Sequence, residues 1–167
     1  MRLVPVLLLL ATAAGCASTT VSVDRDETVD FSALRTFGWR PDPTPEGERE
    51  RPASLFDRRA RREVERRLTE RGYRRADSPD LLLDVSLRTR EVREVTSWDH
   101  GRYWRRHGFV TVRDRIAAAV VLDVVDTRRN AVVWRGATPI ALGPTGPGAE
   151  DVASAVEALL EQFPAGR

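Results

Sequence analysis

The sequence predicts an α+β domain in which a mainly antiparallel sheet carries two helices packed on one face. Two stretches, residues 54–71 and 152–163, have the apolar spacing of amphipathic helices, and five others alternate apolar and polar residues as strands do. Their order along the chain is ββαβββα. With 167 residues, the chain is long enough for one ordinary domain and too short for two.

The composition excludes several classes of protein. The 27 basic residues are all arginine and stand against 25 acidic ones, and no segregated basic face or nucleic-acid-binding module is evident, so we expect no nucleic-acid partner. Hydrophobic residues at 41% and charged residues at 31% exclude a collagen, a multi-span membrane protein and a fully disordered chain. The single cysteine excludes an internal disulfide framework.

The N-terminus has the pattern of an export signal. After Met1-Arg2, the apolar run of residues 3–14 is about 18 Å long as a helix, well short of the roughly 30 Å of a bilayer core. The run ends in Ala13-Ala14-Gly15-Cys16, which resembles a bacterial lipobox and implies that Cys16 is acylated and becomes the mature N-terminus. The alternative is an ordinary signal peptide cut after Ala14.

These features predict three segments. Residues 1–15 form the lipoprotein signal peptide, residues 16–19 the lipidated cysteine with a short tether, and residues 20–164 a single α+β domain. Because the residue after Cys16 is Ala17 and not the aspartate typical of inner-membrane retention, we expect an outer-membrane anchor.

The first half of the domain begins with two short strands, at residues 20–24 and 35–39, followed by a proline-rich loop. Ser54 is the expected N-cap of the first helix, with Asp57 at its third position. Gly72 is expected to end this helix. Its apolar stripe, which Leu55 widens, consists of Phe56, Ala60, Val64 and Leu68.

The second half contains three longer strands and the last helix. A strand with one wet face begins at Asp80, residues 96–109 show no period, and alternation resumes at Val110. A turn over residues 126–130 leads to a hairpin partner over residues 131–142, where Pro139 marks an edge or an exit. In the strand that begins at Val110, one apolar face is expected to contain Ile116, Ala118, Val120, Leu122 and Val124.

Four stretches in this order resemble the bacterial lipoprotein family known as domain of unknown function 4136. They are the lipobox with residues 21–24, then residues 30–39, then Arg71-Gly72-Tyr73 with residues 78–81, and finally residues 122–126 with Val133-Trp134-Arg135-Gly136. The resemblance covers nearly all of the mature chain. It implies a periplasm-facing α+β lipoprotein, and the family has no established activity from which catalytic residues could be inferred.

No motif for catalysis or for a cofactor is present. The glycine-rich segment 143–148 lacks a lysine and precedes acidic Glu150 and Asp151, which disfavours a phosphate site. The two histidines, His100 and His107, lie with Asp99 in a polar segment and are weak candidates for zinc ligands. Solvated loop histidines are the more ordinary interpretation, so we expect no metal and no cofactor.

Two surfaces are candidates for binding. The arginine-rich first helix is compatible with anionic surfaces, although its interleaved glutamates favour a solvent face held by i, i+4 ion pairs. The segment 97–109 lies outside any periodic element and suits a protein, glycan or membrane-interface contact, or else a loop that caps the core. Its candidate interaction residues are Trp98, Arg102, Tyr103, Trp104, Arg105 and Arg106.

The sequence therefore indicates a non-enzymatic binding or accessory module of the envelope. We expect its lipid to anchor it in the outer membrane of a Gram-negative bacterium, facing the periplasm, with an envelope protein or glycan as partner. The alternatives are a periplasmic hydrolase or metal-dependent enzyme with an unrecognised site, and a soluble periplasmic protein if Cys16 is not acylated.

Overall fold

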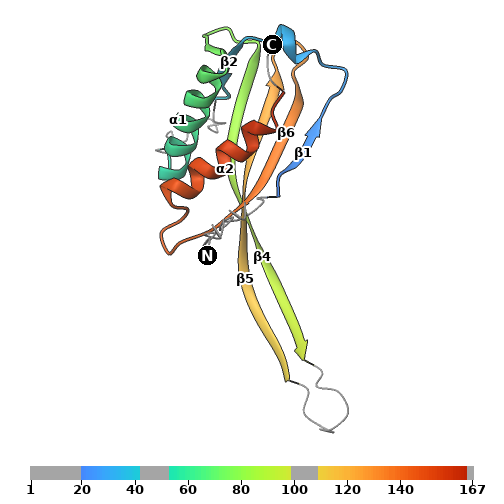
Figure 1. Cartoon of the computed structure of the whole chain (residues 1–167), viewed down its shortest axis with the longest axis vertical. Helices are drawn as coiled ribbons and strands as arrows, with labels where there is room; N and C mark the ends of the chain where they lie inside the picture. The colour runs from blue at the N-terminus through green and yellow to red at the C-terminus, as the bar shows by residue number, and fades with distance from the viewer. Residues whose placement is uncertain (1–19, 42–52, 99–108, 165–167) are drawn as a thin grey trace, which may run out of the picture.

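The computed structural model describes residues 20–41, 53–98 and 109–164. A six-stranded sheet with the strand order β1-β6-β5-β4-β2-β3 carries both helices on one face (Figure 1). The strands are β1 (Ser22–Arg25), β2 (Thr36–Trp39), β3 (Arg74–Arg75), β4 (Leu81–Trp98), β5 (Phe109–Asp126) and β6 (Ala131–Ile140). The helices are α1 (Leu55–Glu70), α2 (Ala149–Glu161) and the short 3₁₀ helix η1 (Phe31–Ala33). The predicted α+β class is confirmed.

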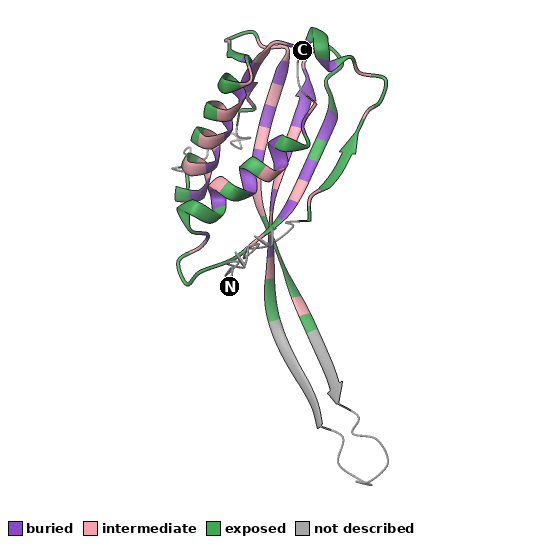
Figure 2. Cartoon of the chain, viewed as in Figure 1, coloured by how far each residue is buried: buried purple, intermediate pink, exposed green. Residues whose placement is uncertain are grey.

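The core lies between the two helices and the sheet (Figure 2). Helix α1 contributes its predicted stripe, whereas Leu55 is 58% exposed and does not widen that stripe. Helix α2 buries Val152, Ala155, Val156, Leu159 and Leu160. Within the described ranges, no helix combines the length and the apolar character needed to cross a membrane.

Local signals place α1 where the sequence predicts it. The Ser54 hydroxyl accepts a hydrogen bond from the Asp57 amide at 3.1 Å, and the Asp57 carboxylate accepts one from the Ser54 amide at 2.9 Å. This reciprocal capping box satisfies two amides that the helix leaves without partners. Gly72 follows the helix with a φ of +87°, a backbone conformation that favours glycine.

Helix α1 also connects two parallel strands. Strand β2 runs parallel to β4, pairing Phe37 with Leu81 and Trp39 with Leu83. The pairs β4–β5, β5–β6 and β1–β6 are antiparallel. The two-residue strand β3 has no alternation that the sequence could show. The apolar and polar alternation of residues 20–24 predicts a half-buried strand, but all four residues of β1 are exposed at the sheet edge beside β6.

The aromatic cluster under α2 holds that helix on the sheet. Trp134 is fully buried and meets the ring of Phe163 edge-on, at 5.2 Å between ring centroids. A β-bulge shifts the pairing of β5 with β6, since Val124 pairs with Trp134 but Val125 pairs with Val132. The alternation of β6 is broken there, and the adjacent Val133 and Trp134 are both buried. Gly136 lies beneath Trp134 and Leu159, where there is no room for a side chain.

Strands β4 and β5 continue far beyond the rest of the sheet (Figure 1). The last pair between β5 and β6 is Ala118 with Ile140, but β4 and β5 remain paired as far as Trp98 and Phe109. The expectation of an aperiodic loop over 96–109 is therefore wrong at both ends, since the strands include residues 96–98 and 109. We call residues 90–98 and 109–117 the β-arm.

Candidate functional site

The β-arm is the feature of this fold that core packing does not explain. Nine residues from each strand lie beyond the β5–β6 pairing, which at 3.3–3.4 Å per residue gives a projection of about 30 Å. Figure 2 shows burial giving way to exposure where the two strands leave the helices. An isolated two-stranded hairpin is at best marginally stable in water. The arm is therefore a candidate contact surface.

The described side chains of the arm are mostly charged and exposed. Arg90, Glu91, Arg93 and Arg115 are exposed, and Val92 is half-buried. Ile116 is 64% exposed, although the alternation of β5 places it on the same face as the buried Ala118 and Val120. The core face of β5 thus ends at Ala118 because the helices and β6 no longer cover the strand beyond that point.

The outer edge of β4 offers backbone hydrogen-bonding groups. The Arg40 amide donates to the Leu83 carbonyl at 2.9 Å, so Leu83 directs its backbone groups toward β2. Successive residues of a strand direct these groups to opposite edges, and Val85, Leu87, Thr89, Glu91 and Arg93 therefore direct theirs to the same edge as Leu83. In the part of the chain that the structure describes, no strand pairs with β4 along this edge beyond Leu83.

The structure brings one predicted interaction residue to the end of the arm. Trp98 is the last residue of β4 and pairs with Phe109. The other candidates lie outside the described residues. They are Arg102, Tyr103, Trp104, Arg105 and Arg106, with the weak metal candidates Asp99, His100 and His107. Cys16 also lies outside them. Among the described residues, no group of three histidine, cysteine or acidic side chains is placed to hold a metal ion.

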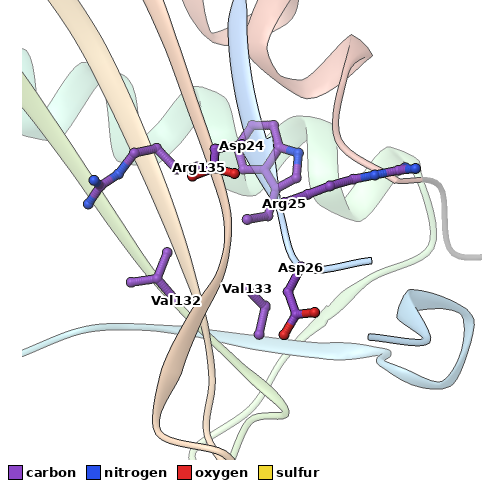
Figure 3. A pocket seen from close by; sticks show the side chains of 7 residues that line it. Asp24, Arg25, Asp26, Val132, Val133 and Arg135 are labelled. Atoms are coloured by element: carbon purple, nitrogen blue, oxygen red, sulfur yellow. The ribbon is translucent and has the colours of Figure 1, made fainter. Parts of the chain in front are cut away.

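An open depression of about 390 Å³ lies where the end of β1 meets the start of β6 (Figure 3). Asp24, Arg25, Asp26 and residues 132–135 line it. Arg25 and Arg135 extend away from each other, and Arg135 binds Asp123 through two contacts of 2.5 and 2.9 Å. Asp26 accepts hydrogen bonds from the amide and hydroxyl of Thr28, which lower the pKa of its carboxyl group. These charged groups bind neighbouring residues of the chain and do not point toward a common position that a ligand could occupy.

Two arginines of α1, Arg66 and Arg67, are engaged in ion pairs. Glu63 accepts hydrogen bonds from Arg66 and, at 2.7 Å, from Arg67, and these bonds lower the pKa of Glu63 to about 2. Arg67 also reaches Glu157 of α2 at 2.8 Å, and Arg66 reaches Glu70 at 2.6 Å. The predicted pairing of this helix's charges is confirmed for Glu63 and Arg67. Arg58 and Arg59 instead donate to the carbonyls of Ala53 and Pro147, so these ion pairs account for part of the helix's arginines.

Asp80 has a structural role at the start of β4. Its carboxylate accepts hydrogen bonds from the amides of Arg35 and Thr36, both at 3.0 Å, and from the Thr36 hydroxyl at 2.7 Å. These bonds lower the pKa of Asp80. The contact ties the segment before β2 to β4 across 44 residues of sequence. Sequence reasoning used Asp80 only as the start of a strand and did not find this role.

Comparison with known proteins establishes the family and the fold. Residues 21–165 match the family described as a domain of unknown function, DUF4136. No curated protein matches the chain. A crystal structure of a PDZ domain protein from Parabacteroides distasonis ATCC 8503 is similar, with a TM-score of 0.58 and 16% identity. The match covers 89% of this chain and 36% of that one, so this chain spans about a third of its length.

Dodecamers of PelC from Paraburkholderia phytofirmans are also similar to the chain. One matches with 15% identity and a TM-score of 0.37, and a second with 14% identity and a TM-score of 0.36. Each match covers 85% of this chain and 97% of PelC. The family match over residues 21–165 includes every described strand and both long helices, and on that basis the chain belongs to the DUF4136 family.

Proposed function

We propose that this protein is a lipid-anchored component of the bacterial envelope that acts as a non-enzymatic binding module. The helix-covered sheet is its scaffold, and the β-arm with the segment 99–108 is its contact surface. The observation that carries the proposal is the extension of β4 and β5 about 30 Å past their last pairing with β6.

The scaffold supports a binding role better than a catalytic one. Enzyme sites are concave and bring a few polar groups together at one point. The depression beside β1 is open, and Arg135 is already held by Asp123. Its lining contains no serine, cysteine or histidine that could act as a nucleophile or base.

The composition of the contact surface supports a macromolecular partner. Tryptophan, tyrosine and arginine are enriched at the energetic centres of protein interfaces. The arm ends at Trp98, and the segment that follows contains Tyr103, Trp104 and several arginines. When aromatic and arginine side chains gather on a surface they usually mark a contact, because exposed apolar patches are costly for solubility.

The lipid anchor is supported by the sequence around Cys16. The experiment that tests it is Cys16→Ala, because an apolar run of twelve residues anchors poorly by itself. We expect the variant to accumulate as a soluble protein or an uncleaved precursor in membrane fractionation. Recovery of the variant at mature size in the outer-membrane fraction would contradict the lipoprotein assignment.

The binding role is tested by shortening the arm. Arg90 and Ala117 face each other in the register, and both direct their backbone groups toward the opposite strand. Residues 91–116 can therefore be replaced by Asn-Gly, the two-residue turn that suits such a hairpin. We expect the shortened protein to keep its melting temperature and to lose its crosslinks to envelope partners in intact cells.

The matched control changes charge on the scaffold and leaves the arm intact. Arg62→Ala lies on the exposed side of α1 and is expected to retain all crosslinks. If the shortened protein kept the wild-type crosslinks, the contact surface would have to lie elsewhere and the proposal would fail.

A further inference from the structure

The free outer edge of β4 can pair with a strand from another chain. An exposed strand edge is a template for a further strand, and proteins normally protect it with charges, bulges or a covering segment. Beyond Leu83, the described residues provide no such partner over Val85–Arg93.

The sequence of the edge is complementary to itself. When two identical strands pair antiparallel about a two-fold axis, facing residues either both direct their backbone groups toward the other strand or both direct them away from it. This holds only if the axis passes between a residue and its own copy, and we call that residue the centre of the pairing. A centre at Val92 places Glu91 opposite Arg93 of the second copy. It also places Arg90 opposite Glu94, giving four opposite-charge pairs in all.

Other registers of the same strand place like charges together or give fewer opposite-charge pairs than the four at Val92. Centres at Ser86 and Leu87 give two such pairs each, between Asp84 and Arg88 or Arg90. Centres at Arg90, Glu91, Arg93 or Glu94 set that residue against its own copy, and a centre at Thr89 sets Arg88 against Arg90. A centre at Val95 places no charged residues of the strand opposite one another. Directly facing like charges destabilise a sheet, whereas opposite charges stabilise it. The register centred at Val92 is therefore selected over these alternatives.

The β5 edge of the arm lacks this property. Its only acidic residue between residues 109 and 117 is Asp114, which is flanked by Arg113 and Arg115. A centre at Asp114 faces that aspartate with itself and sets the two arginines against each other. Arg113 and Arg115 direct their backbone groups to the edge opposite that of Asp114. No pairing centred on a residue can therefore place Asp114 opposite either arginine.

We infer that two copies of this chain associate through their β4 edges, antiparallel and centred on Val92. The inference rests on the proposed function of the arm as contact surface and specifies one partner for it, a second copy. In this register Trp98 of each copy lies beside Ser86 of the other. The end of one arm thereby reaches the part of β4 that lies over the scaffold of its partner.

A charge exchange tests the inference with the detergent-solubilised full chain. Glu91→Arg alone faces Arg93 of the second copy, and Arg93→Glu alone faces Glu91, so each variant repels itself. Mixed together, the two variants restore both opposite-charge pairs. We expect a wild-type dimer in sedimentation velocity, about tenfold weaker association for each variant alone, and recovery of the dimer in the equimolar mixture.

A cysteine crosslink tests the register. Val92 faces itself as a pair without hydrogen bonds, in which the Cα atoms are about 4.5 Å apart, within the range that a disulfide spans. Val92→Cys is therefore expected to form a covalent dimer on mild oxidation in intact cells. The matched control is Ile116→Cys, exposed on β5, and the wild-type chain with Cys16 alone is the blank. Neither should crosslink to itself through the arm.

The contradicting outcomes separate this inference from the proposed function. A monomeric wild-type chain, a dimer unaffected by the single charge changes, or Val92→Cys crosslinking only to another protein would each overturn the second copy as partner. If shortening the arm still abolished envelope crosslinks, the proposed binding function would stand without it. Unchanged melting temperatures for the charge variants would show that loss of the dimer is not loss of the fold.

Discussion

The docking of α2 on the sheet can be tested at Leu159. This side chain is fully buried and lies over Gly136, where a Cβ atom would come within 2.8 Å of its Cδ2 atom. Truncating a buried leucine to alanine removes its transfer free energy and leaves a cavity, at a combined cost of about 2–5 kcal/mol. Leu159→Asp adds the cost of an unpaired buried carboxylate, several kcal/mol more.

These costs are a large fraction of the total free energy of unfolding of a domain, which is about 5–15 kcal/mol. For a domain of this size, each kcal/mol lowers the melting temperature by roughly 2–4 °C. We therefore expect Leu159→Ala to melt about 6–12 °C below wild type, for a loss near 3 kcal/mol, and Leu159→Asp to fail to hold α2 on the sheet.

The assay is thermal unfolding followed by circular dichroism, supported by urea titration. Ser154 is exposed on the same helix, and Ser154→Ala is the matched control because surface changes of this kind stay within about 0.5 kcal/mol. A melting temperature for Leu159→Ala equal to that of Ser154→Ala would refute the packing of α2 that the structure describes.

Three further predictions concern the sheet and the arm. Gly136→Ala should lower stability by about 1–3 kcal/mol in urea titration, because its new methyl group meets Trp134 and Leu159; wild-type stability would show that these side chains move aside freely. The pKa of Asp80 is lowered in the fold by bonds from Arg35 and Thr36, so its stabilising effect is present above the unfolded pKa near 3.8 and is lost as the pH falls through the folded value. The stability gap between wild type and Asp80→Asn should therefore shrink from about pH 7 to about pH 3, and a gap independent of pH would contradict this. Replacing residues 98–107 with a Gly/Ser linker should leave the melting temperature unchanged and abolish crosslinks to envelope partners, whereas loss of folding would show that Trp98 is needed by the core.

The elements that local chemistry determines were predictable from the sequence. The Ser54 cap, the Gly72 stop and the apolar stripe between them depend on neighbours within one or two turns, so their pattern is complete in the local sequence. The same holds for the apolar face of α2. The turn after Asp126 is also local, since the carboxylate of that residue accepts hydrogen bonds from the amides of Arg128 and Arg129.

The features that depend on distant elements were missed. Alternation makes Ile116 equivalent to Ala118, but whether a residue is buried depends on where β6 and the helices end, and no local pattern records that. For the same reason the exposure of β1 follows from its edge position beside β6. The parallel alignment of β2 with β4 depends on the crossover through α1.

The candidate site was found only in part. Composition drew attention to the segment after Trp98, but the sequence did not indicate that two long strands carry it away from the scaffold. The alternation that resumes at Val110 predicts the second of these strands, whereas residues 90–98 carry charges on both faces and show no one-sided apolar period. No local pattern shows that both strands extend beyond the scaffold.

The pairing of β1 with β6 also determines when the sheet can be completed during synthesis. Ser22 is joined to Ala137 and Arg25 to Trp134, so the first strand made waits for more than a hundred further residues before it finds its partner. Contacts of such long sequence separation slow folding because a large loop must close before they form. A chain interrupted before β6 would expose the edge of β5 and would lack Trp134, the largest fully buried side chain of the core.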